Sequence, residues 1–186
     1  MKLTLSASRI LFKQEEFWKE VPQSDLLRLL QYSLFLGLFP FSGYLFAYTV
    51  RGTIWNVWPF VHTTLDVGSG LVFASLQWIL FAVFPVLASL ILERIASRLN
   101  LSFDFSRASV VATYALTPLS LGLLFAGVPY LDRVFSTFGF SAFPYMLYYG
   151  FRSFMQYSIS ASSAMASLYA ALFILIRQLF VFAIGY

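Results

Sequence analysis

The sequence has no cysteine and a single histidine, His62, among its 186 residues. Without cysteine there is no disulfide framework, thiolate zinc site, iron–sulfur cluster or thiol nucleophile. One histidine is too few for the multi-histidine metal sites of most redox membrane proteins, and a serine hydrolase would have only His62 as its base. The motifs H-E-x-x-H, G-x-S-x-G and Walker A are also missing. We therefore predict no metal, no cofactor and no catalytic residues, and a protein that is not an enzyme.

Charged residues are scarce, at 11% of the chain against about 25% in an average soluble protein. The acidic residues after the N-terminal arm fall in predicted loops or at predicted helix ends: Asp66, Glu93, Asp104 and Asp132. No paired carboxylates then face each other in the middle of a membrane, which argues against a proton-coupled transporter and an intramembrane aspartyl protease. The net charge is +4, but the basic residues do not form a cluster, so we expect no nucleic-acid partner.

Apolar residues dominate what remains, with 60% hydrophobic and 20% aromatic residues. A soluble domain of this length has too small a core to bury them. A bilayer core about 30 Å thick needs about 20 apolar residues per helix. Five stretches meet or approach that length: 26–50, 71–92, 108–128, 135–150 and 158–182. The predicted fold is all-α: a polytopic membrane protein whose domain 26–186 is a bundle of five transmembrane helices, preceded by an N-terminal interfacial helix in the arm 1–25.

Lysine and arginine in the short loops predict the orientation of these helices. With the N-terminus inside, nine basic residues are cytoplasmic and only two, Arg51 and Arg133, are outside. The nine are Lys2, Arg9, Lys13, Lys19, Arg28, Arg94, Arg98, Arg107 and Arg152. We predict a multi-pass protein of the cytoplasmic (inner) membrane, with a cytoplasmic N-terminus, a C-terminus outside, and membrane lipids as partners.

The N-terminal arm reads "SRILFKQEEFWKEVPQSD" and mixes apolar residues such as Phe17 and Trp18 with charges. Pro22 ends any helix there. Such a helix either lies flat among the cytoplasmic headgroups or packs beneath the bundle. In the outer loop after the first span, Trp55 and Trp58 are typical interfacial anchors. His62 in that loop has no second nitrogen or thiolate ligand, so it is a weak candidate for binding a metal or haem iron.

Small residues four apart mark candidate packing faces. In the fifth span these are Ser160 with Ala164, and Ser163 with Ser167. Similar pairs are Ser33 with Gly37, and Gly122 with Ala126. We favour packing within the bundle for these faces, and contact with another membrane protein subunit is the alternative.

Arg177 is an intramembrane charge within an apolar run near the end of the chain. If the span is 158–179, the side chain of the arginine extends to the outer surface of the membrane. If the span is 167–186, the guanidinium lies near the midplane, where insertion scales give a charged residue a free-energy cost of about 2.5–3.5 kcal/mol. We favour the first placement, with Arg177 held by helix-end carbonyls, Asp132 or Asp66.

Two segments, "YALTPLS" (114–120) and "PYMLYYGFRSF" (144–154), resemble the bacterial Yip1 family of membrane proteins. The matching positions are a tyrosine four residues before a proline, then leucine, tyrosine and glycine at the end of the fourth helix: Tyr114, Pro118, Leu147, Tyr149 and Gly150. Tyr148 is an additional tyrosine inserted among these matching positions. The resemblance extends over about residues 9 to 180 and implies a five-helix bundle with a cytoplasmic N-terminus. Eukaryotic relatives bind Rab-type GTPases through a long N-terminal region with a D-L-Y-G-P motif. That region is lacking here, so the resemblance leaves GTPase binding doubtful.

Three functions remain open. The favoured one is a non-enzymatic scaffold or accessory subunit that acts through helix–helix, lipid or protein contacts. The second is a small-solute carrier or channel, which needs a water-wide path lined by residues such as Tyr114, Thr117 and Ser120. The third is a pigment-, quinone- or lipid-binding subunit of an energy-converting complex, with the 22 phenylalanines as apolar walls.

Overall fold

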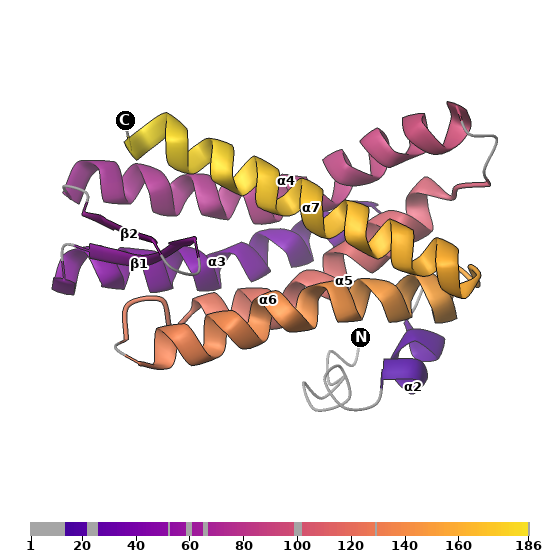
Figure 1. Cartoon of the computed structure of the whole chain (residues 1–186), viewed down its shortest axis with the longest axis horizontal. Helices are drawn as coiled ribbons and strands as arrows, with labels where there is room; N and C mark the ends of the chain where they lie inside the picture. Colours follow the sequence, from indigo (N-terminus) through magenta and orange to yellow (C-terminus); the bar gives the residue numbers. More distant parts are fainter. Residues whose placement is uncertain are drawn as a thin grey trace.

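The structure is a computed structural model, and it describes residues 14–21, 26–51, 53–58, 61–64, 67–98, 102–128 and 130–185. Helices form nearly all of this described part. Its elements in chain order are α2 (Gln14–Glu20), α3 (Leu26–Arg51), β1 (Thr53–Trp58), β2 (Val61–Thr64), α4 (Val67–Arg98), α5 (Phe105–Leu123), α6 (Leu131–Tyr149), the π-helix η1 (Gly150–Phe154) and α7 (Ile159–Gly185). The long helices run side by side as a bundle, with α2 at one end and the β-strands at the other (Figure 1). The prediction of an all-α protein is confirmed.

Among the residues that the structure describes, three helices are long and apolar enough to cross a membrane. Their candidate spans are Leu26–Thr49 in α3, Val67–Arg98 in α4 and Ile159–Phe180 in α7. The other two predicted stretches are also helical, and α5 and α6 have 19 residues each. These three candidate spans suggest a multi-pass membrane protein.

Helix α5 lies in the interior of the bundle, in contact with α3, α4 and α6. It starts at Asp104, whose carboxylate accepts a hydrogen bond from the backbone N–H of Arg107 at 3.0 Å. Its polar side chains face neighbouring helices: the Tyr32 and Thr117 hydroxyls are 3.1 Å apart, and the Ser120 hydroxyl donates to the carbonyl of Leu36. A helix that neighbouring helices surround can be less apolar than one that faces lipid.

Glycines allow two pairs of helices to approach closely. A Cβ on Gly122 of α5 would lie 2.3 Å from the carbonyl oxygen of Phe135 in α6, and one on Gly139 would lie 3.0 Å from that of Pro118. A Cβ on Gly37 of α3 would lie 2.5 Å from the Trp78 ring of α4. The pairs Ser33 with Gly37 and Gly122 with Ala126 therefore pack inside the bundle, as small residues do between membrane helices.

The loop after α3 contains a hairpin that hydropathy did not indicate. Strands β1 and β2 pair antiparallel, with Thr53 opposite Thr64 and Trp58 opposite Val61. The β-branched and aromatic residues of "TIWNVW" and "VHTT" explain the strands, because such residues favour a pleated backbone. The side chain of His62 lies outside the described residues.

Helix α2, the described part of the N-terminal arm, packs beneath the bundle, which is the second of the two arrangements considered for it. In α2, Phe17 is fully buried and Trp18 is 1% exposed. Their rings meet Tyr114 of α5 edge to face at centroid distances of 5.7 and 6.5 Å, and Trp18 also lies 6.1 Å from Phe154. Residues 1–13 of the predicted arm lie outside the described residues.

Candidate functional site

Arg177 belongs to a stripe of residues that α7 buries against the bundle. Ser162, Ala166, Tyr169, Phe173 and Arg177 follow one another at intervals of three or four residues, which places them on one helix face. The helix continues past Arg177 to Gly185, and the arginine is 3% exposed. The candidate span Ile159–Phe180 agrees with the favoured span 158–179, and within it the structure buries the guanidinium inside the bundle.

The partner of Arg177 is a tyrosine from the first long helix. Its Nη2 donates a hydrogen bond of 2.8 Å to the hydroxyl of Tyr44 in α3, a fully buried residue. Its Cζ lies 5.2 Å from the ring centroid of Phe140 in α6, within cation–π range. Arg177 therefore connects three helices. Two carboxylates were proposed as partners from the sequence. Asp132 accepts a hydrogen bond of 2.6 Å from the backbone N–H of Arg133. Asp66 lies outside the described residues.

Gln77 of α4 adds a buried amide to the same region. It is fully buried, and neither atom of its amide has a hydrogen-bond partner within the described part of the chain. It lies between Phe73, which meets Tyr44 at 5.0 Å, and Phe81, which meets Phe173 at 5.7 Å. Gln77 is therefore level with Arg177 along the bundle. The sequence signal for it was weak, because one glutamine in an apolar helix does not stand out.

The group Arg177, Tyr44 and Gln77 can donate and accept hydrogen bonds, but a guanidinium, a phenol and an amide supply no general base at neutral pH. In the ranges that the structure describes, no three His, Cys, Asp or Glu side chains gather where they could hold a metal ion. Within this group, the hydrogen bond between helices is the one that Arg177 donates to Tyr44.

Two of the five motif residues named from the sequence meet under α2. The Tyr114 ring contacts Phe17 and Trp18, and it lies 5.1 Å from the ring of Tyr32. Gly150 faces the same helix, since a Cβ there would lie 3.0 Å from the Trp18 ring and 2.5 Å from Val111. Tyr114 and Gly150 thus form part of the seat on which α2 docks.

The other three motif residues lie elsewhere, and Leu147 of α6 is fully buried. Pro118 is buried where α5 crosses α6 at Gly139. Tyr149 is half-buried and stands with Tyr145 and Tyr148, at ring distances of 4.8 and 5.3 Å. Thr117 and Ser120, named for a solute path, form the hydrogen bonds between α3 and α5 described above. Their hydroxyls are thus engaged in helix packing.

The small residues of α7 that were named from the sequence face away from the bundle. Ser160, Ala164, Ser167 and Ala171 are all exposed and lie on the side of the helix opposite Tyr169 and Phe173. Ser163 is exposed as well. Packing within the bundle, which we favoured for this face, is therefore wrong for these residues, and contact with another subunit remains.

Comparisons with known proteins give no match: no family model fits the chain, and no curated protein or solved structure matches it significantly.

Proposed function

We propose that this chain is an integral protein of the cytoplasmic membrane in which all five long helices cross the bilayer, with the N-terminus inside and the C-terminal end of α7 outside. Large apolar side chains are exposed around the bundle, such as Leu27 (66%), Val134 (64%) and Leu175 (58%) on α3, α6 and α7. Helices of 19 residues extend about 28 Å, close to the bilayer core of about 30 Å. The excess of basic residues at one end supports the orientation.

Single-cysteine labelling tests whether α5 crosses, because the chain has no native cysteine. Arg98 ends α4 and Tyr130 precedes α6, and both are exposed. We expect a membrane-impermeant maleimide to label Tyr130→Cys in intact cells, and to label Arg98→Cys and the exposed α2 variant Lys19→Cys only after permeabilisation. If Tyr130→Cys and Arg98→Cys react from the same side, α5 does not cross and the five-span topology is wrong.

Within this topology we propose a non-enzymatic accessory subunit or scaffold, similar to the Yip1 family, that binds another membrane protein. The observation that carries the proposal is the exposed small-residue face of α7, formed by Ser160, Ala164, Ser167 and Ala171. Small residues at this spacing permit close backbone contact between helices in lipid, where apolar side chains alone give little drive to associate. GTPase binding is not part of this proposal.

Cross-linking in native membranes tests this face. Ala164→Cys places a thiol on the small-residue face, and Leu90→Cys places one on an exposed position of α4 (46%). We expect a bifunctional thiol- and amine-reactive reagent to give one defined adduct with Ala164→Cys, identified by mass spectrometry, and none with Leu90→Cys. Equal or diffuse cross-linking of the two variants would show that α7 has no preferred partner.

A further inference from the structure

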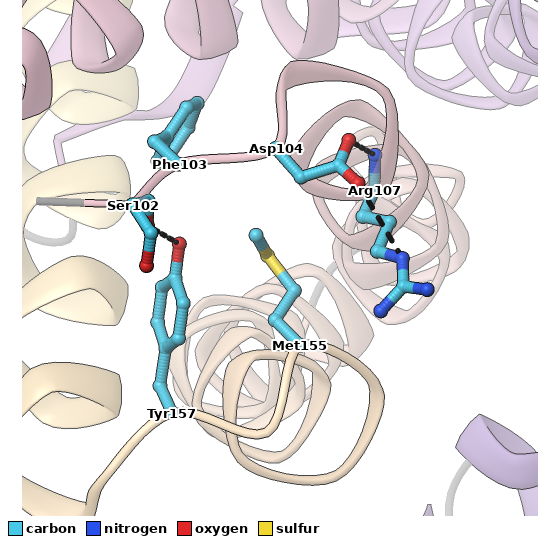
Figure 2. A pocket seen from close by; sticks show the side chains of 6 residues that line it. All are labelled: Ser102, Phe103, Asp104, Arg107, Met155 and Tyr157. Atoms are coloured by element: carbon cyan, nitrogen blue, oxygen red, sulfur yellow. Dashed lines mark hydrogen bonds and ion pairs between the residues drawn. The ribbon is translucent and has the colours of Figure 1, made fainter.

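A pocket opens at the end of the bundle that carries α2, η1 and the start of α7. Its volume is about 240 Å³. Two connections form it, one before α5 and one before α7, and its lining residues are Ser102, Phe103, Asp104, Arg107, Met155 and Tyr157 (Figure 2). Liquid water occupies about 30 Å³ per molecule, so the pocket has room for a group of several heavy atoms.

One wall carries a cation and an anion side by side. The Nε of Arg107 lies 3.5 Å from Oδ2 of Asp104, and the two side chains are 40% and 52% exposed. Ion pairs as exposed as this one contribute little to the stability of a protein. Either group can therefore leave the pair and bind a ligand with little loss of stability. The Nη groups of Arg107 make no hydrogen bond with the residues that the structure describes, and its Cζ lies 5.9 Å from the Phe154 ring.

The opposite wall is a neutral aromatic donor. The Tyr157 hydroxyl donates to the carbonyl of Ser102 at 3.0 Å. Burial raises the pKa of Tyr157, and the nearby Asp104 carboxylate raises it further, so the phenol stays protonated at physiological pH. Arg152 holds this segment by donating to the Tyr157 carbonyl at 2.8 Å. Met155, which is 9% exposed, and the half-buried Phe103 add apolar surface.

We propose that this pocket binds the headgroup of a phospholipid with a primary ammonium, of the phosphatidylethanolamine class, with its phosphate on Arg107 and its ammonium on Asp104. Both charges of the headgroup meet their opposites on one wall, and the aromatic and thioether groups contact the glycerol end. The exposed Arg94, Arg98 and Arg152 lie at the same end of the bundle, where the proposed topology places the cytoplasmic headgroups. The inference rests on the membrane location and is independent of the partner of α7.

The pairing of charges distinguishes this class from other lipids. A phosphatidylglycerol offers Arg107 the same phosphate but gives Asp104 no cation. A phosphatidylcholine carries a quaternary ammonium, which cannot donate a hydrogen bond to the carboxylate. Phosphatidylethanolamine satisfies both side chains.

The test uses the full chain, purified in mild detergent and stripped of lipid, with short-chain phosphatidylethanolamine, phosphatidylcholine and phosphatidylglycerol added separately and binding followed by native mass spectrometry. We expect phosphatidylethanolamine to bind most tightly. Arg107→Gln should weaken it about tenfold, the loss of one charged hydrogen bond. Asp104→Asn keeps the helix cap and should remove the preference over phosphatidylcholine. Arg98→Gln, an exposed arginine outside the pocket, is the matched control.

Three results would overturn the proposal: tighter binding of phosphatidylglycerol, equal binding to wild type and Arg107→Gln, or binding of free phosphoethanolamine as tight as that of the lipid. If Arg107→Gln does not fold, Asp104→Asn still decides, because an unchanged preference for phosphatidylethanolamine contradicts the assigned role of the carboxylate. The topology and cross-linking experiments above can fail without affecting these measurements.

Discussion

Replacing Trp18 with alanine is expected to release α2 from the bundle while leaving the five long helices packed. Trp18 is 1% exposed and contacts Phe17, Tyr114 and Phe154. Truncation of a buried tryptophan costs about 3–5 kcal/mol. Because α2 has only seven residues, it cannot remain helical without its seat. Docking of this helix should therefore weaken by about a hundredfold or more.

Limited trypsin digestion in detergent measures this release, since Lys19 lies in α2 and is cut only when the helix opens. We expect cleavage at Lys19 to accelerate strongly in Trp18→Ala. Nε1 of Trp18 has no hydrogen-bond partner among the described residues, so Trp18→Phe should keep most of the docking. Glu15→Ala, an exposed change in the same helix, should cleave like wild type. Similar rates for Trp18→Ala and wild type would mean that α2 does not need this aromatic seat.

Hydropathy located the long helices because length and apolar content are local properties of the chain. Each of the five predicted stretches corresponds to a long helix, but several of their bounds differ. Helix α4 extends from Val67 to Arg98, beyond the predicted 71–92, α5 ends at Leu123 and not at 128, and α6 begins at Leu131 and not at 135. Hydropathy alone did not reveal that α5 is central. Its serines and threonines lower its apolar content, and they are tolerated because α3, α4 and α6 surround it.

Which face of a helix is buried depends on its neighbours, and here sequence reasoning was wrong for α7. The small residues Ser160 and Ala164 resemble those at Gly122, yet Gly122 packs against α6 and the α7 pair is exposed. A signal did exist. Tyr169, Phe173 and Arg177 are four residues apart, so the aromatic face and the arginine lie together, opposite the small residues.

The sequence places Arg177 near the end of the span 158–179, and the candidate span Ile159–Phe180 agrees with that placement. The structure adds two contacts that the sequence did not indicate, because the hydroxyl of Tyr44 and the ring of Phe140 lie at the guanidinium. Tyr44 is 133 residues away in the chain, and no local pattern could have paired the two.

A double-mutant cycle on Arg177 and Tyr44 is expected to show strong coupling. Tyr44→Phe keeps the ring that packs on Phe73 but removes the hydrogen-bond acceptor of a buried cation. Hydrogen bonds to charged groups contribute about 1.5–3 kcal/mol, so we expect Tyr44→Phe to destabilise the protein by that amount. The measurement is reversible unfolding in mixed detergent micelles, with far-ultraviolet circular dichroism to report helix content.

Arg177→Leu removes both stabilising and destabilising contributions to the free energy of unfolding. It removes the hydrogen bond to Tyr44 and the contact with Phe140, and it also removes the desolvation cost of a buried charge, which is several kcal/mol. Without the arginine, the Tyr44 hydroxyl no longer accepts a hydrogen bond from a cation. Tyr44→Phe should therefore cause almost no further destabilisation in the Arg177→Leu background. The expected coupling is about 1.5–3 kcal/mol, against less than about 0.5 kcal/mol for independent sites. Additive effects would mean that the tyrosine does not stabilise the arginine. Arg177 would then be held within the bundle by its other contacts alone.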